Sequence, residues 1–385
     1  MSESVLNSFA LTYASVTGER GDLQGFLVNF ARADHHPVDA CHLLTLLEEL
    51  WPLQSTLALG VEDPALLLDL LRQPPRPWLA LVLPPLLALD PKHQADFEQS
   101  RANGHRLYCQ HQAGIEQIAH PCPWRLLDYG RGGHTQAQPG DWCLDVPSLA
   151  LARECLQAGA TGIVGWPDAD VLARAHATHS VGADPASLQA LKELLREEAS
   201  LDQVEHALMR DPVLLWHLLR HVNPAGQPGQ REPVPLRRAL MLMGYGALER
   251  WLDAQSKLPG ACPELRPLTR TLVLRAMFME QLVLAGAEDA LGREIYLCGL
   301  FSMIAPLLGI PAAEALSGLP LSERVSDALV GHHGPYRPFL DLVLASEGRD
   351  GDHVAVIAHA HGLDIAAVNR ALLRSLAHAA PWWSA

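Results

Sequence analysis

Histidine occurs 19 times among the 385 residues of this sequence, so metal sites are the first chemistry to consider. His217 and His221 lie four residues apart, a spacing at which two imidazoles on one helix can bind zinc. No glutamate follows His217, so the HExxH pattern of zinc hydrolases is absent. Pairs at this spacing arise readily by chance among so many histidines. We therefore interpret the two side chains as packing or surface residues.

Two further histidine groups have spacings that deserve the same test. His332 and His333 stand between glycines, where adjacent imidazoles on a turn could bind a metal or act as a base. His353, His359 and His361 form a second group, but His359 and His361 are two residues apart and do not share a helix face. We interpret the first group as a polar loop between helices and the second as surface residues.

Nucleophile and phosphate-binding motifs are absent from the sequence, which contains no GxSxG, GxGxxG or GxxxxGK[ST] pattern. The run Arg131-Gly132-Gly133-His134 could offer backbone N–H groups to a phosphate, but a flexible loop is the favoured interpretation. Cys109 lies among several histidines and is interpreted as a buried strand residue. The seven cysteines are scattered without a CxxC pair, which favours reduced thiols in a cytoplasmic protein.

The first half of the chain alternates short apolar runs with helical patterns. This alternation predicts parallel strands joined by crossover helices, and five or more such units can close into a barrel. The expected strands are Phe26–Phe30, Thr56–Val61, Trp78–Leu83, His105–Cys109 and Thr161–Trp166, and the expected helices are His42–Leu50, Pro64–Leu71, Phe97–Asn103 and Leu149–Ala158.

The second half of the chain has helical periodicity throughout. Asp184-Pro185 and Asp211-Pro212 have the residue types of a helix N-cap and first turn, and leucines follow each pair at helical spacing. Nothing in this half resembles a strand. The sequence therefore predicts an α/β barrel domain over residues 1–182 and an all-helical domain over residues 185–385.

Charge and hydropathy exclude several classes of protein. The 29 basic and 43 acidic residues give a net charge of −14, which disfavours nonspecific binding to nucleic acid or to an anionic membrane surface. The longest charge-free apolar stretch, Trp78–Leu89, falls short of the roughly 20 residues that a membrane-spanning helix needs. Met1–Asn7 lacks the basic start of a secretory signal. We expect a cytoplasmic protein without membrane insertion.

Four segments of the second half resemble the HDOD domain. Asp211-Pro212 through Asn223 matches the pattern DPxLxxxLLrlvNs, and Pro235–Gly244 matches sixxAlxllG. Ile295–Ser302 matches aFlaGLls, and Leu319–Ser322 matches the LPLs of a subgroup that couples a divergent EAL domain to a C-terminal HDOD domain. Within these motifs we expect Asn223 to end the helix that starts at Asp211, and Gly244 to permit a tight turn or close helix approach.

HDOD domains resemble HD-type metal phosphohydrolases, which need a His-Asp pair to hold a metal that activates water. Where an HD enzyme reads GLLHDIGK, this chain reads Gly299-Leu300-Phe301-Ser302-Met303. Ser302 and Met303 therefore stand in place of the pair, and neither is a good ligand for a hard cation. The resemblance implies an output or interaction module.

A second resemblance links Leu23–Phe30 to the strand vvGyELLfR of EAL domains. EAL enzymes cleave cyclic di-GMP with two divalent metals, held mainly by carboxylates together with an asparagine and a lysine. Of the KlD motif only Asp128 is retained. At the other ligand positions the resemblance places residues different from the family's ligands, namely Leu27, Gly60, Leu81, Gln110, His111, Leu126 and Leu144.

Together the two resemblances imply a non-catalytic scaffold that binds other signalling proteins in a cyclic di-GMP pathway of motility, biofilm or surface behaviour, without a cofactor. One alternative is a receptor that binds cyclic di-GMP, weakly and without turnover, through Arg106, Arg125 and Arg131. Another is a metal-dependent phosphohydrolase built on histidines near His111 or His332. A third is a homodimer that uses the apolar segment Ala379–Trp383 with its paired Trp382-Trp383, which could equally fold back on the HDOD core.

Overall fold

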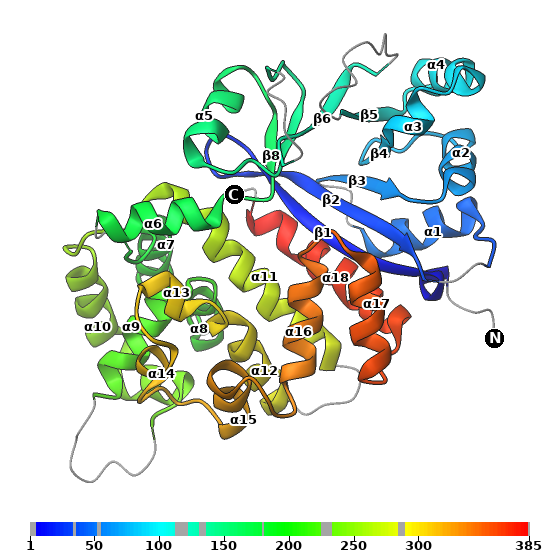
Figure 1. Ribbon diagram of the computed structural model, residues 1–385. Coiled ribbons are helices and arrows are strands. Elements are labelled where there is room, and N and C mark those ends of the chain that lie inside the picture. Colours follow the sequence, from blue (N-terminus) through cyan, green and yellow to red (C-terminus); the bar gives the residue numbers. More distant parts are fainter. Residues whose placement is uncertain are drawn as a thin grey trace. The chain divides into compact units, whose positions relative to one another are not determined.

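Eight strands close into a barrel in the first part of the chain (Figure 1). The first strand runs antiparallel to both of its neighbours, and all other neighbouring pairs are parallel. The strands are β1 (Phe9–Thr17), β2 (Leu23–Arg32), β3 (Thr56–Val61), β4 (Leu79–Leu83), β5 (Arg106–His111), β6 (Trp124–Asp128), β7 (Trp142–Leu144) and β8 (Gly162–Val164).

The computed structural model describes residues 5–33, 36–51, 55–111, 122–130, 136–178, 181–224, 233–283 and 289–383. The chain divides into two units. Met1–Asp170 and Asp341–Ala385 form one, called here the barrel unit, and Val171–Leu340 forms the other, called the helical unit. The predicted barrel and the predicted helical region are both confirmed at this level.

Short helices follow most of the barrel strands, as the alternating sequence pattern predicts. They are α1 (Ala40–Leu50), α2 (Pro64–Arg72), α3 (Pro85–Ala88), α4 (Gln94–Ala102), α5 (Leu149–Gln157) and α6 (Asp168–Ala177), with 3-10 turns at Val5–Ser8 and Pro91–His93. Asp63 caps α2 by accepting the N–H of Ala65, and the following proline occupies the first turn. Asp90 caps the 3-10 turn in the same way.

Alternate residues of the strands fill the barrel with apolar side chains. Trp142 and Tyr108 stack there with ring centroids 4.5 Å apart. The buried residues of this interior are Val16, Leu27, Ala58, Ala80, Val82, Tyr108, Leu126, Trp142, Leu144 and Val164.

The last two helices, α17 (Gly351–Ala360) and α18 (Ile365–Trp383), belong to the barrel unit and lie beside β1 and β2 (Figure 1). Asn369 of α18 is fully buried and donates to the carbonyl oxygens of Leu6 at 2.9 Å and Phe9 at 2.7 Å. It also accepts the N–H of Leu11 at 3.3 Å. The extents of the two units therefore differ from the predicted domains 1–182 and 185–385, because β1 needs partners from the end of the chain.

The apolar C-terminus is part of the barrel unit rather than a surface patch or part of the helical core. Trp383 is fully buried and meets the ring of Phe26 of β2 edge-on, with centroids 6.0 Å apart. Both interpretations that the sequence left open for Ala379–Trp383 are thus corrected for Trp383. The side chain of Trp382 lies outside the described residues.

The helical unit contains no strand in the part of it that the structure describes. Asp184 caps the helix over Pro185–Arg196 and Asp211 caps the helix over Pro212–Val222, as predicted. The helices are α7 (Pro185–Arg196), α8 (Leu201–Met209), α9 (Pro212–Val222), α10 (Leu236–Gln255), α11 (Arg266–Val283), α12 (Asp289–Phe301), α13 (Ile304–Leu308), α14 (Ala312–Leu316), α15 (Glu323–Ser326) and α16 (Arg337–Ser346), which crosses into the barrel unit; a 3-10 turn at Pro263–Leu265 and a π-helical turn at Asp327–Gly331 complete the list.

Three motif residues of this unit shape its backbone. Gly244 has φ 67° and breaks α10, so the expected turn is present. Asn223 ends α9, and its buried amide donates to Leu219 O and Val234 O and accepts from Val234 N–H. Gly299 lies where a Cβ atom would be 2.6 Å from the Cα atom of Ala276, so α11 and α12 approach too closely there for any side chain.

Replacing Asn369 with leucine should destabilise the barrel unit, because two buried carbonyl groups and one N–H would lose their partner. We expect a loss of about 3 kcal/mol or more in the free energy of unfolding, measured with urea and circular dichroism. Arg374→Ala, an exposed change on the same helix, is the control and should be nearly neutral. Equal effects of the two changes would contradict the role given to Asn369.

Gly299→Ala should destabilise the helical unit, because the added methyl group meets backbone atoms of α11. We expect a loss of about 1–3 kcal/mol in urea unfolding. Gly246→Ala is the matched control, since its Cβ would meet nothing nearer than the Arg250 side chain at 3.7 Å. That change should stabilise α10 by about 0.5–1 kcal/mol, and the opposite order of the two variants would refute this packing argument.

Candidate functional site

A cavity of about 390 Å³ lies at the mouth of the barrel, where the parallel strands end. Ligand sites of β/α barrels are built at this end of the strands. The cavity is lined by Leu27, Asn29, Gly60, Val61, Glu62, Val82, Pro84, Gln110, Leu126, Leu144 and Arg349.

Five of the seven positions at which the sequence suggests lost metal ligands converge on this cavity. They are Leu27, Gly60, Gln110, Leu126 and Leu144. The structure does not bring Leu81 and His111 to the cavity lining. Strand alternation turns Leu81 away from the interior that Ala80 and Val82 face, so the residue of β4 at the mouth is Val82, one position further along.

The floor of the cavity is apolar. Leu27, Leu126 and Leu144 are at most 4% exposed, and none of them has an atom that binds a hard cation. Polar groups on the lining come from Asn29, Glu62, Gln110 and Arg349. A single lining carboxylate among leucines does not fit the carboxylate-rich set that a two-metal site requires.

The side chain of Asn29 occupies the space that a side chain at Gly60 would need. The Asn29 amide donates to Thr12 Oγ1 at 3.3 Å, and its Oδ1 atom would lie 2.4 Å from a Cβ atom at position 60. Only glycine therefore leaves room for the amide at this point of the mouth. The sequence signals Gly60 as a lost ligand, but it gives no sign that the neighbouring strand supplies an amide there.

A guanidinium group at the mouth is the main feature that sequence reasoning missed. Arg349, in the turn between α16 and α17, forms ion pairs with Asp145 and with Asp128, the latter at 3.4 Å between Nη2 and Oδ2. The Asp128 side chain is fully buried and also accepts the Gly130 N–H at 3.0 Å. More than 200 residues separate Arg349 from either carboxylate, so no local pattern could have revealed the contact.

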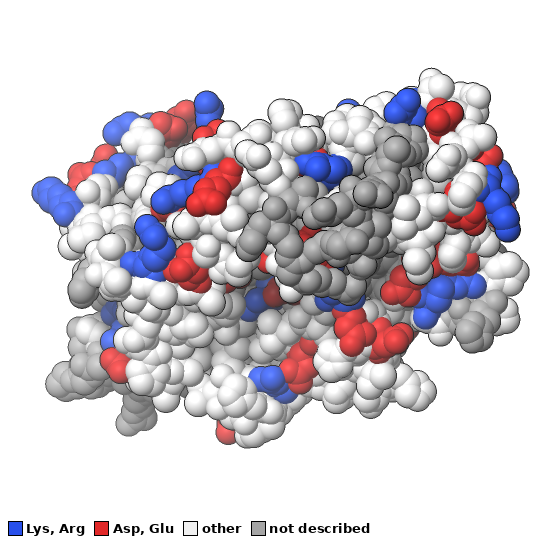
Figure 2. All heavy atoms as spheres, turned by 45° about the horizontal axis from the view of Figure 1, so that its top comes forward, with Lys and Arg blue, Asp and Glu red and all other residues white. Residues whose placement is uncertain are grey.

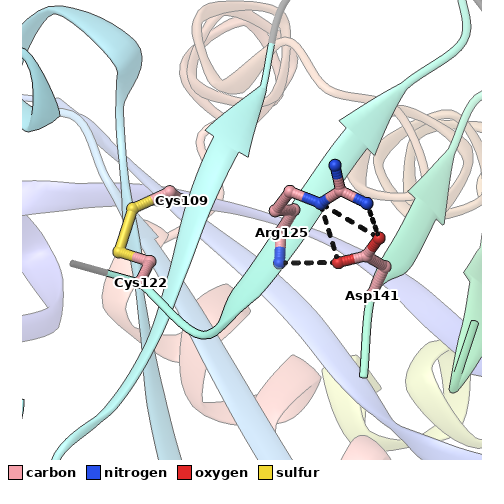
Figure 3. The surroundings of a disulfide bond; sticks show 4 residues. All are labelled: Cys109, Cys122, Arg125 and Asp141. Carbon is pink, nitrogen blue, oxygen red and sulfur yellow. Dashed lines mark hydrogen bonds and ion pairs between the residues drawn. A yellow bond between two sulfur atoms is a disulfide. The ribbon is translucent and has the colours of Figure 1, made fainter. Parts of the chain in front are cut away.

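The arginines proposed for nucleotide binding do not reach the mouth. Arg106 is the first residue of β5 and Arg125 the second residue of β6, so both stand at the opposite ends of their strands. Arg125 is committed to the buried carboxylate of Asp141, with Nη2 2.5 Å from Oδ2 and two further bonds of 3.1 Å from Nε (Figure 3). Arg131 and the run to His134 lie outside the described residues.

One expectation about the cysteines is wrong. Cys109 and Cys122 form a disulfide, with Cα atoms 5.9 Å apart, between β5 and the segment before β6 (Figure 3). Cys109 is nevertheless a buried strand residue, as predicted. The two positions are 13 residues apart, and the spacing gave no sign of pairing because no motif marks it.

A buried thiol pair lies elsewhere in the barrel unit. Cys143 of β7 and Cys155 of α5 belong to one apolar cluster and have almost no exposed surface. Hydrogen bonding from Cys143 lowers the pKa of Cys155 to about 7, and the same hydrogen bond is the main cause that raises the pKa of Cys143. Because neither sulfur is accessible, the pair is not a site for a substrate.

A second guanidinium lies beside Ser302 and Met303 in the helical unit. Arg275 of α11 is 3% exposed and donates to Ser302 Oγ at 2.6 Å, with its Nη2 atom 3.8 Å from the sulfur of Met303. Ser302 in turn donates to Gly299 O at 2.6 Å. A buried cation at this position opposes the binding of a metal ion.

The histidine groups are not assembled into metal sites. His217 lies edge-on to Trp216, burial lowers its pKa, and His221 lies beside the ring of Trp251. His332 has φ 56° and accepts at Nδ1 from Arg337 at 2.7 Å. Across the residues that the structure describes, no group of three or more His, Cys, Asp and Glu side chains could hold a metal ion.

His353 and His361 share a second cavity of about 560 Å³ with Asp341 and Asp350, between α16 and α17. Both imidazoles are exposed, and His359 is not part of the lining. His359 lies in the last turn of α17 and His361 is its C-cap residue, so the spacing argument for these two stays a prediction.

Acidic and basic side chains are interspersed on the face shown in Figure 2 and do not gather into a basic area. None of the helices within the described ranges has the length and apolar character needed to cross a bilayer.

Among the described carboxyl groups of the helical unit, Asp211 has the largest shift in pKa. It accepts the N–H groups of Val213, Leu214 and Asp184, the last at 3.1 Å. Burial raises its pKa to about 6 from an ordinary value of 3.8, and the carboxylate of Asp184, itself paired with Arg266, adds to the increase.

Asp211→Asn should remove the contribution of Asp211 to the pH dependence of stability while keeping an oxygen atom for the cap. The folded state holds the Asp211 proton between about pH 4 and 6 where the unfolded state releases it, so raising the pH favours unfolding of the natural chain. We expect its stability relative to the variant to fall by about 3 kcal/mol across this range, measured by urea unfolding at pH 4 to 7. A difference that does not change with pH would contradict the raised pKa.

The chain is distantly similar to curated bacterial proteins. Over 168 residues it is 27% identical to the uncharacterized protein YuxH of Bacillus subtilis, a stretch that covers 42% of this chain and 40% of that protein. Over 189 residues it is 24% identical to the cyclic di-GMP phosphodiesterase CdgJ of Vibrio cholerae, covering 49% and 44% respectively. The matches thus span less than half the length of these relatives.

Comparisons with family models and with solved structures are less informative. No family model matches the chain. Among solved structures, the response regulator MmoQ of Methylococcus capsulatus is 19% identical, with 52% of this chain and 82% of that chain covered. The TM-score of this pair is 0.28, which does not establish a common fold.

Proposed function

We propose that this chain is a non-catalytic signalling protein that acts by binding other proteins in a pathway related to cyclic di-GMP. In this proposal the barrel unit is a degenerate EAL domain and the helical unit is an HDOD domain. The pathway is proposed on the distant similarity to a phosphodiesterase of cyclic di-GMP and on the sequence motifs.

The observation that carries the proposal is the chemistry of the barrel mouth. Cleavage of a phosphodiester by two metals needs several oxygen ligands directed at one point. Leu27, Leu126 and Leu144, which the EAL resemblance aligns with three of those ligands, line the cavity here. The two aspartates nearest the mouth, Asp128 and Asp145, are already paired with Arg349. This arrangement argues against turnover.

The helical unit supports the same conclusion independently. A water-activating metal of the HD type would have to occupy the region of Ser302 and Met303, where the buried guanidinium of Arg275 lies. Repulsion between this cation and a metal ion adds to the loss of the ligands. We therefore assign to this unit a role in contacts with partner proteins, which are unidentified.

The alternative of a receptor without turnover is less well supported. Arg106 and Arg125 stand at the far ends of their strands, and Arg349 is neutralised by two carboxylates. Among the described residues of the mouth, Glu62 adds a third carboxylate to the single guanidinium of Arg349, a balance that disfavours the phosphates of a nucleotide.

A calorimetric titration of the full chain with cyclic di-GMP, in the presence of Mg²⁺ or Mn²⁺, tests the proposal. We expect neither heat nor cleavage products up to high micromolar nucleotide, because the metal ligands are missing and the mouth is acidic. An active phosphodiesterase in the same buffer is the positive control. Cleavage would refute the non-catalytic role.

Binding without cleavage would favour the receptor. In that case Gln110→Leu, which removes an amide from the mouth, should abolish the heat, whereas Arg106→Ala at the opposite end of the barrel should not. The reverse result would place the nucleotide away from the mouth.

A further inference from the structure

Asp128, Asp145 and Arg349 form a cluster of charges that the proposed function does not require. The two carboxylates follow neighbouring strands of the barrel, since Asp128 ends β6 and Asp145 directly follows β7. Arg349 reaches both from the turn between α16 and α17. All three residues belong to the barrel unit.

The burial of Asp128 makes a cationic partner necessary. Its side chain has no exposed surface, and an ionised carboxylate in such a place is costly unless it is paired and hydrogen-bonded. The Gly130 N–H supplies one bond and Arg349 supplies the opposite charge. Asp145 adds a second carboxylate. Its backbone has φ 53°, in the left-handed region that a non-glycine residue rarely adopts.

The turn that carries Arg349 is fixed to the barrel on both sides. Before it, Glu347 accepts from the hydroxyl of Tyr13 of β1 at 3.4 Å. After it, Gly351 lies so close to β2 that a Cβ atom there would be 2.2 Å from the Cβ atom of Ala31. Contacts on both sides of the turn therefore hold the Arg349 guanidinium at the mouth.

We propose that Arg349 is a built-in cation at the mouth of the barrel that keeps divalent metal ions away from Asp128 and Asp145. Carboxylate oxygens are the ligands that Mg²⁺ and Mn²⁺ prefer, and Asp128 and Asp145 offer them from adjacent strands. A guanidinium between the same oxygens satisfies their charge and repels a metal ion. This inference concerns a cation alone, so it holds or fails whether or not the chain binds cyclic di-GMP or a partner protein.

The test is a Mn²⁺ titration of the full chain, with free Mn²⁺ followed by electron paramagnetic resonance. Arg349→Met removes the charge while keeping a long side chain, and we expect it to bind Mn²⁺ about tenfold or more tightly than the natural chain. Arg349→Lys retains a cation and should stay close to the natural chain. Arg72→Met, which removes an exposed arginine paired with Asp69 on α2, is the matched control and should change nothing.

Adding Asp128→Asn to Arg349→Met identifies the site, because the gained Mn²⁺ binding should be lost again. The double variant also covers the case in which Arg349→Met alone fails to fold, since removing both charges should restore a folded protein by circular dichroism. The proposal is overturned if the natural chain and Arg349→Met bind Mn²⁺ equally, if the gain survives Asp128→Asn, or if the double variant does not recover the fold that the single variant loses.

Discussion

The buried amide of Asn369 joins the last long helix to the first strand, and the arrangement of the barrel unit depends on this join. Strand β1 runs against the direction of its two neighbours and begins directly after a 3-10 turn. Backbone groups at Leu6, Phe9 and Leu11 find their partner in one side chain from α18. Since buried backbone groups must be paired, the barrel unit includes the end of the chain.

Each unit holds an arginine where metal chemistry would need anionic ligands. Arg349 lies between two aspartates at the barrel mouth, and Arg275 lies beside the hydroxyl of Ser302 and the thioether of Met303. The chemistry of the two places differs, because Arg349 neutralises charge whereas Ser302 and Met303 carry none. In both, a cation is fixed where a metal ion would have to enter, and this is the physical basis for proposing interaction rather than catalysis.

Much of the architecture was predictable because short stretches of sequence determine it. Apolar runs in the sequence predicted five of the strands, namely β2, β3, β4, β5 and β8. Asp-Pro pairs predicted the starts of three helices. β7 has only three residues, too few to show a period, and β1 is antiparallel, which the strand–helix alternation does not suggest. Leu81 shows a related limit, since an error of one residue along a strand turns a side chain from one face to the other.

The candidate site was less accessible to sequence reasoning than the fold. Leu27, Leu126 and Leu144 were singled out by the resemblance to a family motif, and the structure brings all three to one cavity. Arg349 and its aspartates were not found, since their contact depends on the return of the C-terminal segment to the barrel. The Cys109–Cys122 disulfide was missed for a similar reason, because only the fold brings the two thiols together.

The order of the units along the chain has a consequence for biosynthesis. The helical unit is inserted between the strands of the barrel unit and the two helices that complete it. A ribosome that has finished β8 must add about 200 residues before α18 is available, which takes about 10–40 s at ordinary elongation rates. During that interval the surface of β1 and β2 that α17 and α18 will cover stays exposed, whereas the helical unit is continuous in sequence and is complete before α17 is made. The barrel strands therefore wait longer than the helical unit for the segments that complete their packing.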